Sequence, residues 1–417
     1  MLAAPEYKSN GLAAMRRGDD GTVQLDTGRL GNVSERIVVT YEKDGQVVGR
    51  TVPHDHTIGD SLEERVLGAR NTIFAQELWG ELAREARSLA AYDVRPEDKR
   101  LTYTVSPGTN VIIELLPVDS CHARDDSLPE NAVADTIQSA LSILLTYAHR
   151  CNELSRIRPM PPHIPRSRGP QTHPLLRPII GRMMSLRSVQ ACSEYIGGLT
   201  KVLQKAGLQA SFILRTPPYT AADQGSFGSN QVSSALTLLR NMLQPIDFVI
   251  DLTLLPDISF PIRGRTYLYP VTATYYNVIA PPESSLHRIC APYTDGYPDL
   301  RALADYLRTV TARALTDHVF AKIVSANKET TAWTLGVQGT SFCNEESEKN
   351  AEVCISIADD GEKVTALVVT SSSEDDGDAT DSGHNTKKWK WSIGSESSET
   401  PPVFLKAVGE ALEQDLS

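Results

Sequence analysis

The sequence predicts an α+β fold in which mixed helices and mostly antiparallel strands form two or three packed lobes. Apolar residues recur every three or four positions over 61–92 and 298–316, which is typical of amphipathic helices. Two-residue alternation over 246–254 predicts a strand. The chain has 417 residues, 41% of them hydrophobic, so it can bury at least one full core.

The first predicted lobe covers residues 35–156 and opens with a hairpin. Residues 1–34 mix Gly, Asp and Arg with little apolar periodicity, which predicts a linker or a disordered terminus. After them, β-branched runs at 36–41 and 47–52 flank Asp44 and Gly45, a dipeptide that favours a tight turn between paired strands.

A long amphipathic helix is predicted from Ser61 to about residue 92. Ser61 and Glu64 have the spacing at which the two side chains satisfy each other's backbone amides in a first helical turn. At 1.5 Å per residue the helix would run roughly 45 Å, and its apolar side needs a cover. That side consists of Leu62, Val66, Ile73, Leu78, Leu82, Ala86 and Leu89.

A second hairpin and a second helix complete the first lobe. The strands of the hairpin are predicted at 101–105 and 111–116, and a turn with Pro107 and Gly108 separates them. Ser127 and Glu130 repeat the capping spacing, which places the start of the helix at Ser127. Its apolar stripe is Val133, Ile137, Leu141, Leu144, Ala148 and Cys151.

Seven prolines between residues 157 and 178 predict an extended Pro/Arg-rich linker, and an α/β lobe at 179–323 follows it. In this lobe we expect a helix that ends near Ala206 with Gly207 as its cap, and strands at 246–254 and 267–279. Another helix begins at Pro298, and its seven-residue apolar repeat through Leu303 and Leu307 predicts a seam against another helix.

Residues 324–417 are predicted to form antiparallel strands and a final helix. The strands are expected at 332–337, 353–357, 364–369 and 389–393, and the helix carries Phe404, Val408, Leu412 and Leu416. Residues 371–386 are rich in Ser, Asp and Gly, which predicts a disordered acidic loop.

Composition and motifs point away from several functional classes. The net charge of −11 argues against general attraction to nucleic acid. The six cysteines form no Cys-x-x-Cys pair, which indicates reduced thiols in cytosol or nucleus. No apolar run approaches the length of a membrane span, and the first residues lack the apolar core of a secretion signal. We expect no catalytic residue, no metal and no cofactor.

Two alternatives stay open. The first is a metal-dependent hydrolase that uses His54, His56 and Asp60, because imidazole and carboxylate ligands suit zinc or iron. The second is a nucleic-acid-binding module. Eight arginines against one acid, Glu153, lie between 150 and 187, and guanidinium groups pair with phosphates or carboxylates. These arginines are Arg150, Arg156, Arg158, Arg166, Arg168, Arg177, Arg182 and Arg187.

Three stretches of the chain resemble subunit 17 of the fungal Mediator complex. They are the helix at 69–87 with the hairpin to Leu116 behind it, the helix end at 141–150, and the Leu-Leu-Arg-Pro turn at 175–178. The likeness covers about residues 35–325 in the same order. Members of this family carry a long helical N-terminal half that this sequence lacks, so the chain is similar to the C-terminal portion.

The resemblance implies a non-catalytic structural subunit of the Mediator head module, located in the nucleus. Its partners would be the other head-module subunits and, through the complex, RNA polymerase II and general initiation factors, without a membrane and without sequence-specific DNA binding. We predict partner contacts at Arg150, Arg156, Arg158, Arg166 and Arg168, and along the two long helices at Ile73, Leu78, Leu82, Leu303 and Leu307.

Overall fold

The chain divides into two compact units in the computed structural model. Unit 1 comprises Met1–Met183 and Gln224–Gln244, and unit 2 comprises Met184–Asp223 and Pro245–Ser417. The structure describes residues 15–19, 21, 23–25, 34–52, 61–121, 125–157, 173–215, 239, 241–326, 333–344, 349–372, 385–394 and 403–416. The strand pairings over these residues are antiparallel, which confirms the predicted α+β class.

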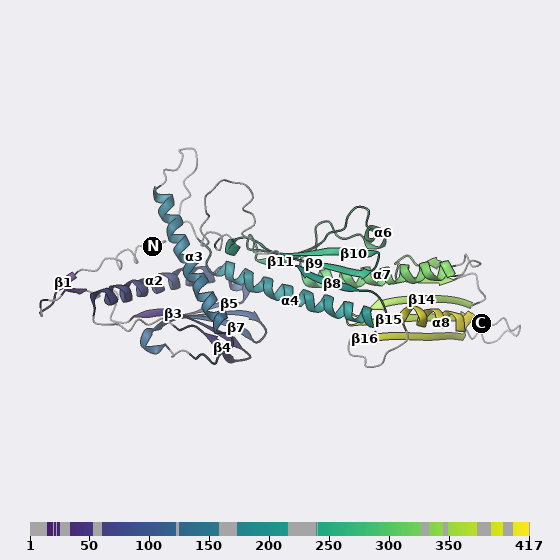
Figure 1. Ribbon diagram of the computed structural model, residues 1–417, viewed down its shortest axis with the longest axis horizontal. Helices are drawn as coiled ribbons and strands as arrows, with labels where there is room; N and C mark the ends of the chain where they lie inside the picture. Colours follow the sequence, from purple (N-terminus) through teal and green to yellow (C-terminus); the bar gives the residue numbers. More distant parts are fainter. Residues whose placement is uncertain are drawn as a thin grey trace. The chain divides into compact units, whose positions relative to one another are not determined.

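Unit 1 is a five-stranded sheet with two helices on it. The strand order is β4-β3-β7-β6-β5, and β1 pairs with β2 in a separate hairpin within the predicted linker. Both α2 and α3 contact β3 (Figure 1). The elements are β1 (Met15–Arg17), β2 (Val23–Leu25), β3 (Glu35–Lys43), β4 (Gln46–Arg50), α2 (Leu62–Ala86), η1 (Ala90–Tyr92), β5 (Val94–Glu97), β6 (Arg100–Ser106), β7 (Thr109–Pro117), η2 (Val118–Ser120) and α3 (Asn131–Ile157).

Local signals placed the first hairpin and the start of α2 correctly. Asp44 and Gly45 have φ values of 50° and 76°, as the predicted tight turn requires. The Ser61 side chain accepts a hydrogen bond from the Glu64 amide at 3.3 Å and donates one to its carboxylate at 2.8 Å. The helix ends at Ala86 rather than near residue 92, because the chain turns there to bury Leu89.

The prediction that Ser127 caps α3 is wrong. Its amide and hydroxyl both donate to the Asp125 carboxylate, at 3.0 and 2.5 Å, and the helix begins only at Asn131. The Asn131 side-chain oxygen accepts from the Arg50 amide at 2.9 Å. The start of α3 is therefore tied to β4, and the capping spacing at 127–130 serves a turn before the helix.

Unit 2 contains two antiparallel sheets. One has the order β11-β10-β9-β8 and the other β12-β13-β14-β15-β16. Helix α4 (Leu176–Lys205) contributes its first residues to unit 1 and the rest to unit 2. The remaining elements are β8 (Ser211–Arg215), β9 (Ile246–Leu255), β10 (Ile258–Tyr267), β11 (Ala273–Val278), α6 (Leu286–Cys290), α7 (Leu300–Ala326), β12 (Trp333–Leu335), β13 (Ser341–Asn344), β14 (Lys349–Ile357), β15 (Lys363–Ser372), β16 (Asn385–Gly394) and α8 (Phe404–Leu416).

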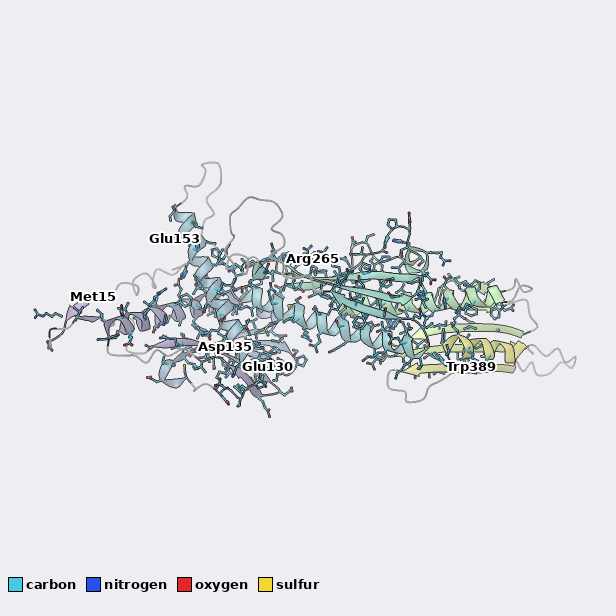
Figure 2. All side chains as sticks on the ribbon, in the orientation of Figure 1. Met15, Glu130, Asp135, Glu153, Arg265 and Trp389 are labelled. Carbon is cyan, nitrogen blue, oxygen red and sulfur yellow. The ribbon has the colours of Figure 1, made fainter. Side chains whose placement is uncertain are left out.

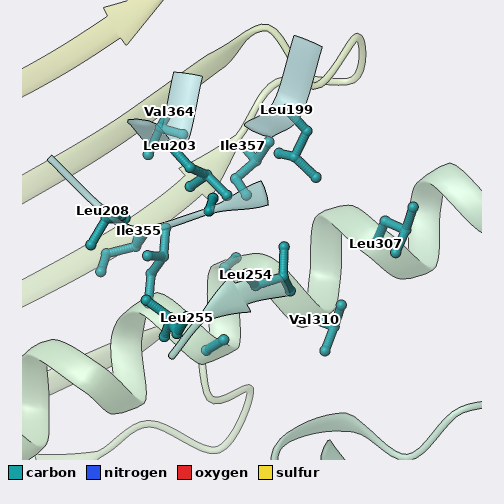
Figure 3. Packing of buried hydrophobic residues seen from close by; sticks show 14 of the residues in the cluster. Leu199, Leu203, Leu208, Leu254, Leu255, Leu307, Val310, Ile355, Ile357 and Val364 are labelled. Carbon is teal, nitrogen blue, oxygen red and sulfur yellow. The ribbon is translucent and has the colours of Figure 1, made fainter. Parts of the chain in front are cut away.

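One hydrophobic core joins both sheets of unit 2 through α4, α7 and α8. Figure 3 shows part of this core, with labelled residues of α4, α7 and both sheets. Leu307 and Val310 of α7 lie in this core with Leu254 of β9 and Ile355 of β14. The seven-residue repeat of α7 therefore packs largely on sheets, with α6 beside it, and not along a partner helix as predicted. The core holds residues from the predicted 179–323 lobe and from the 324–417 segment.

Other expectations for unit 2 were partly wrong. The predicted strand at 267–279 is interrupted by a turn with a cis bond between Tyr269 and Pro270, and β10 before it was missed. Strands β15 and β16 extend to Ser372 and from Asn385, into the predicted acidic loop, whose residues 373–384 lie outside the described part. Gly207, with φ of 83°, follows the end of α4 as predicted.

Candidate functional site

A row of glutamates on α2 holds together the helices of unit 1. Glu77, Glu81 and Glu85 follow one another at four-residue spacing, so they lie on one side of the helix. Glu77 is 2% exposed and Glu81 is 8% exposed. Carboxylates at such depth need partners, because burial without them would cost several kcal/mol. The partners of Glu77 and Glu85 come from distant parts of the chain, and that of Glu81 lies on the same helix.

Glu85 caps the beginning of α4. Its carboxylate accepts hydrogen bonds from the backbone amides of Leu175, Leu176 and Arg177, at 2.7, 2.9 and 3.1 Å. The first amides of a helix have no partner within the helix, and the helix dipole is positive at this end. A carboxylate from a second helix meets both needs at once. Glu85 therefore fixes the start of α4 against the end of α2.

Further contacts surround this cap. The Arg177 guanidinium lies over the Tyr92 ring with 6.0 Å to its centroid, and Arg182 donates to the backbone carbonyl of Asn241. His173 directly precedes α4, and burial lowers the pKa of its imidazole below the usual 6.5. This histidine is therefore mostly neutral at pH 7.

Glu77 ties α2 to α3. Its Oε2 lies 3.2 Å from Nε2 of His149, and the Phe74 ring stands edge-on to the imidazole at 6.4 Å between centroids. Glu81 pairs with Arg84 one turn along α2. The pair of Glu77 and His149, with Phe74 beside it, thus holds α2 against α3. Leucines of both helices are buried in the core of unit 1.

Glu35 of β3 ties the sheet to α2. Its carboxylate accepts from Lys99 at 2.6 Å and from the Gln76 amide at 2.9 Å. Burial raises the pKa of Glu35, but the two hydrogen bonds and the Lys99 charge together bring it below its usual 4.5. Glu35 is therefore ionised at neutral pH and joins β3, α2 and the turn before β6.

A cleft of about 210 Å³ opens between α2, α3 and β3. Arg36 lies at this cleft and donates to Thr72 Oγ1 at 3.2 Å. The lining combines apolar and polar side chains, namely Arg36, Ile37, Asn71, Phe74, Ala75, Leu78, Gln138 and Ser142. These groups can hold an apolar side chain with hydrogen bonds at its margin. Ser142 is the only Ser among these lining residues, none of them is Cys or Lys, and no general base of the lining stands beside it to make it a nucleophile.

All four leucines predicted to contact partners are enclosed in this chain's own cores. Leu78 is 2% exposed, and Leu82, Leu303 and Leu307 are fully buried. Ile73 is half-buried. Partner contact through the four leucines would require the cores to open, so a binding surface on these helices has to use their exposed residues.

The arginine block divides into several environments. Arg150 is exposed on α3, near the labelled Glu153 (Figure 2), and Arg187 is exposed on α4. Arg177 and Arg182 are engaged within unit 1. The Arg156 side chain and residues Arg158, Arg166 and Arg168 lie outside the described part, so their role stays a prediction.

The suggested metal ligands His54, His56 and Asp60 also lie outside the described residues. Within the described ranges, no group of three or more His, Cys, Asp or Glu side chains is placed to hold a metal ion. Over the same ranges, no helix is long and apolar enough to cross a membrane.

The roles of Glu77, Glu85 and His149 were not predicted from the sequence. A signal was present, because Glu77 and Glu81 each directly precede a leucine of the apolar stripe, Leu78 and Leu82. Carboxylates so close to a buried face indicate buried pairing. The identity of the partners was not readable, since Leu175 lies 90 residues beyond Glu85.

Comparison with known proteins identifies similar sequences. Residues 3–203 match the family model of subunit 17 of the Mediator complex. Subunit 17 of Neosartorya fischeri is 31% identical over 69% of this chain and 46% of its own length. The Aspergillus fumigatus subunit is 29% identical over 89% of this chain and 58% of its own length. The chain thus spans about half the length of these curated relatives.

A solved structure is also similar to this chain. The Mediator head module of Schizosaccharomyces pombe contains a chain that matches with a TM-score of 0.45 and 14% identity, over 67% of this chain and 63% of that one. A TM-score below 0.5 does not establish a common fold. The relationship is therefore carried by the sequence matches.

Proposed function

Because this chain is related to subunit 17 of the fungal Mediator complex, we propose that it is a non-catalytic structural subunit of that complex. The similarity to the Aspergillus fumigatus subunit over 89% of the chain is the observation that carries the proposal. Its place would be the nucleus, and its partners the other subunits of the Mediator head module. RNA polymerase II and the general initiation factors would be reached through the assembled complex.

The geometry of unit 1 supports a structural role. The helix at 69–87 and the turn at 175–178, two stretches that resemble the family, meet at the Glu85 cap. The charged groups at this junction are used for positioning, because Glu85 binds backbone amides and Glu77 pairs with His149. Such an arrangement gives a fixed frame on which other proteins can assemble.

Contacts with partners would then come from exposed side chains of that frame. Arg150 is exposed on α3, and we keep Arg156, Arg158, Arg166 and Arg168 as proposed contacts for acidic partner surfaces. Arginine suits this task because its planar guanidinium pairs with a carboxylate through two hydrogen bonds. No described contact of the block favours nucleic acid over protein.

The test is quantitative mass spectrometry of the proteins that co-purify with a tagged copy from nuclear extract of the source organism. We expect the other Mediator head subunits in near-equal amounts with the tagged chain, and RNA polymerase II in smaller amount. Recovery of the tagged chain without any Mediator subunit would refute the proposal. An untagged extract processed in parallel identifies proteins that bind the resin.

A second measurement addresses the arginines. Replacing Arg150 and Arg156 by Glu should reduce recovery of at least one head subunit severalfold, because charge reversal opposes an acidic partner. The matched control reverses an exposed acid on the same helix, Glu153→Lys, and should leave recovery unchanged or higher. Equal recovery with all three proteins would remove the arginine block from the proposed interface.

A further inference from the structure

Over the described residues, the four-stranded sheet of unit 2 has one face in the buried core and one open face, whose side chains are half-buried or exposed. Phe248, Ile250 and Leu252 of β9 belong to the buried core, and α7 contacts β9 and β11 on that side. The residues between them, such as Asp247, Val249 and Asp251, are only half-buried. The open face is therefore the set of alternate residues that point away from the core.

The composition of the open face is unusual for solvent-exposed surface. It has three arginines and two tyrosines but no lysine and no glutamate, although both are common on protein surfaces. Interfaces are enriched in Arg and Tyr and depleted in Lys and Glu. The face consists of Ser211, Ile213, Arg215, Asp247, Val249, Asp251, Thr253, Ser259, Pro261, Arg263, Arg265, Tyr267, Ala273, Tyr275, Asn277 and Ile279.

The charged residues of the open face hold one another in place. Asp247 pairs with both Arg263 and Arg265, and Arg265 Nε lies 3.0 Å from Asp247 Oδ1. Arg265 is labelled in Figure 2. Arg265 also lies over the Tyr267 ring, 5.5 Å from its centroid. Fixed side chains lose little entropy when a partner binds, so this network is preorganised for contact.

The net charge of the open face is positive. Three guanidiniums face two carboxylates, because Asp247 serves two arginines while Asp251 pairs with Arg215. The Arg215 side chain is 64% exposed at the edge strand β8. A partner with carboxylates at its margin would complement this surplus.

Apolar side chains supply the rest of the contact area. In the sheet register Ile213, Asp251, Pro261 and Ile279 form one row across the strands, because Asp251 stands opposite both Ile213 and Pro261 and the Ile279 amide donates to the Pro261 carbonyl. Three of these four residues are apolar. Ile213 is 63% exposed and Ile279 is 48% exposed. At the other end of the face Tyr275 is 39% exposed and packs edge-on to Tyr267.

We propose that this open face is the docking surface for an amphipathic α-helix of another polypeptide, with an apolar stripe and acidic residues at its margin. A helix fits because the ladder bonds of β9 and β10 are already made within the sheet, which leaves side chains as the means of contact. The opposite face is covered in the same way by the apolar stripe of α7. This inference rests on the proposed function, since the polypeptide would be another subunit of the assembly.

The size of the face sets the strength of the interaction. The strands have 5, 10, 10 and 6 residues. At about 3.3 Å per residue and 4.8 Å between strands they cover roughly 500 Å². A stable interface buries about 800 Å² on each partner. The helix therefore docks here as one of several contacts within an assembly, and not as an isolated tight pair.

The first arm of the test uses the full tagged chain in the source organism. The double variant Ile213→Asp with Arg215→Glu places two acids on the open face at side chains exposed enough to keep the fold. The control is Val337→Asp, an apolar residue of the same unit that is fully exposed elsewhere. Thermal unfolding of the three purified proteins verifies that they fold alike, and mass spectrometry compares the subunits recovered with each.

We expect the double variant to lose one particular subunit about tenfold, while Val337→Asp recovers all subunits as the wild type does. Equal recovery with both variants overturns the docking surface. Absence of Mediator subunits even from the wild-type preparation refutes the proposed function instead, so the two failures are distinct.

A photo-crosslinking residue in place of Tyr275 identifies the occupant. The aromatic p-benzoylphenylalanine replaces an exposed aromatic side chain, and the crosslinked peptide is sequenced from the purified assembly. We expect a peptide of another subunit with apolar residues at helical spacing and flanking Asp or Glu. Crosslinks only within this chain, to a second copy of it, to a peptide without helical periodicity or to nucleic acid overturn the proposal.

Discussion

Replacing Glu85 by Ala tests whether the start of α4 depends on a carboxylate supplied by α2. The variant removes three hydrogen bonds of 2.7 to 3.1 Å and leaves the amides of Leu175, Leu176 and Arg177 partly buried without their acceptor. Hydrogen bonds to a charged group are worth about 1.5–3 kcal/mol each, but three bonds to one carboxylate are not additive. An isolated N-cap is worth about 1 kcal/mol and the helix dipole about 0.3–1 kcal/mol more.

From these contributions we expect Glu85→Ala to lower the free energy of unfolding by about 3 kcal/mol, because the amides also lose their partner inside the protein. For a unit of roughly 200 residues this corresponds to a fall in Tm of about 6–12 °C. Glu85→Gln should cost about half as much, since the amide keeps one oxygen as acceptor but loses the charge.

The assay is thermal and urea unfolding followed by circular dichroism, with amide hydrogen exchange read at residues 175–177. Glu153→Ala is the matched control, an exposed glutamate on α3 whose loss should change stability by less than about 0.5 kcal/mol. Exchange at 175–177 should accelerate in Glu85→Ala and not in the control. If Glu85→Ala unfolds at the temperature of Glu153→Ala, the cap does not stabilise the protein and the reasoning is refuted.

Three further predictions concern acid stability, thiol reactivity and packing. The pKa of Glu35 is lower in the folded protein than the usual 4.5, so the stabilisation that this carboxylate provides is complete above pH 4.5 and is lost as pH falls through the folded pKa. The free energy of unfolding should therefore decline less between pH 6 and 3 in Glu35→Gln than in the wild type. Parallel curves of unfolding free energy against pH would contradict this prediction. Burial raises the pKa of Cys192 to about 12, so iodoacetamide at pH 8 should modify this thiol only after denaturation, and mass spectrometry showing rapid labelling of the native protein would refute its burial. A Cβ at Gly264 would lie 2.1 Å from the Phe248 ring, so Gly264→Ala should lower stability by about 1–3 kcal/mol. Gly409→Ala, in open space on α8, should instead raise stability by about 0.5–1 kcal/mol, and unfolding curves that rank the two variants alike would contradict the packing argument.

Several elements were readable from the sequence because their causes lie within a few residues. The turn at Asp44 and Gly45 needs two positive φ angles, and the start of α2 needs a hydroxyl three residues before a carboxylate. The same spacing was misleading at Ser127, because its hydroxyl and amide donate to the Asp125 carboxylate and do not cap the helix. The spacing of two residues shows which hydrogen bonds they can form, but other nearby acceptors and donors determine which of these bonds form.

Longer patterns identified an element without identifying its partner. The apolar repeat of α7 predicted a seam against another helix, whereas Leu303 and Leu307 are buried in this chain's own core and α7 packs largely on sheets with α6 beside it. The periodicity of apolar residues indicates which side of a helix is buried, but it does not indicate whether a sheet or another helix covers that side. Strand β10 was missed because Pro261 lies within it, and because Gly264 and Thr266 interrupt the apolar residues of its buried face.

The α+β class, most of the helices and hairpins, and the similarity to Mediator subunit 17 were all readable from the amino-acid sequence. The folded chain was needed to show that Glu85 caps a helix 90 residues away, that four predicted contact leucines lie in cores, and that Arg263 and Arg265 share Asp247 on an open sheet face. Hydrogen-bond spacing and hydrophobic periodicity act between near neighbours in the chain, so they are visible in sequence. Pairings across long chain separations depend on how the packed elements meet, and they become definite only when the fold brings the groups within a few ångströms.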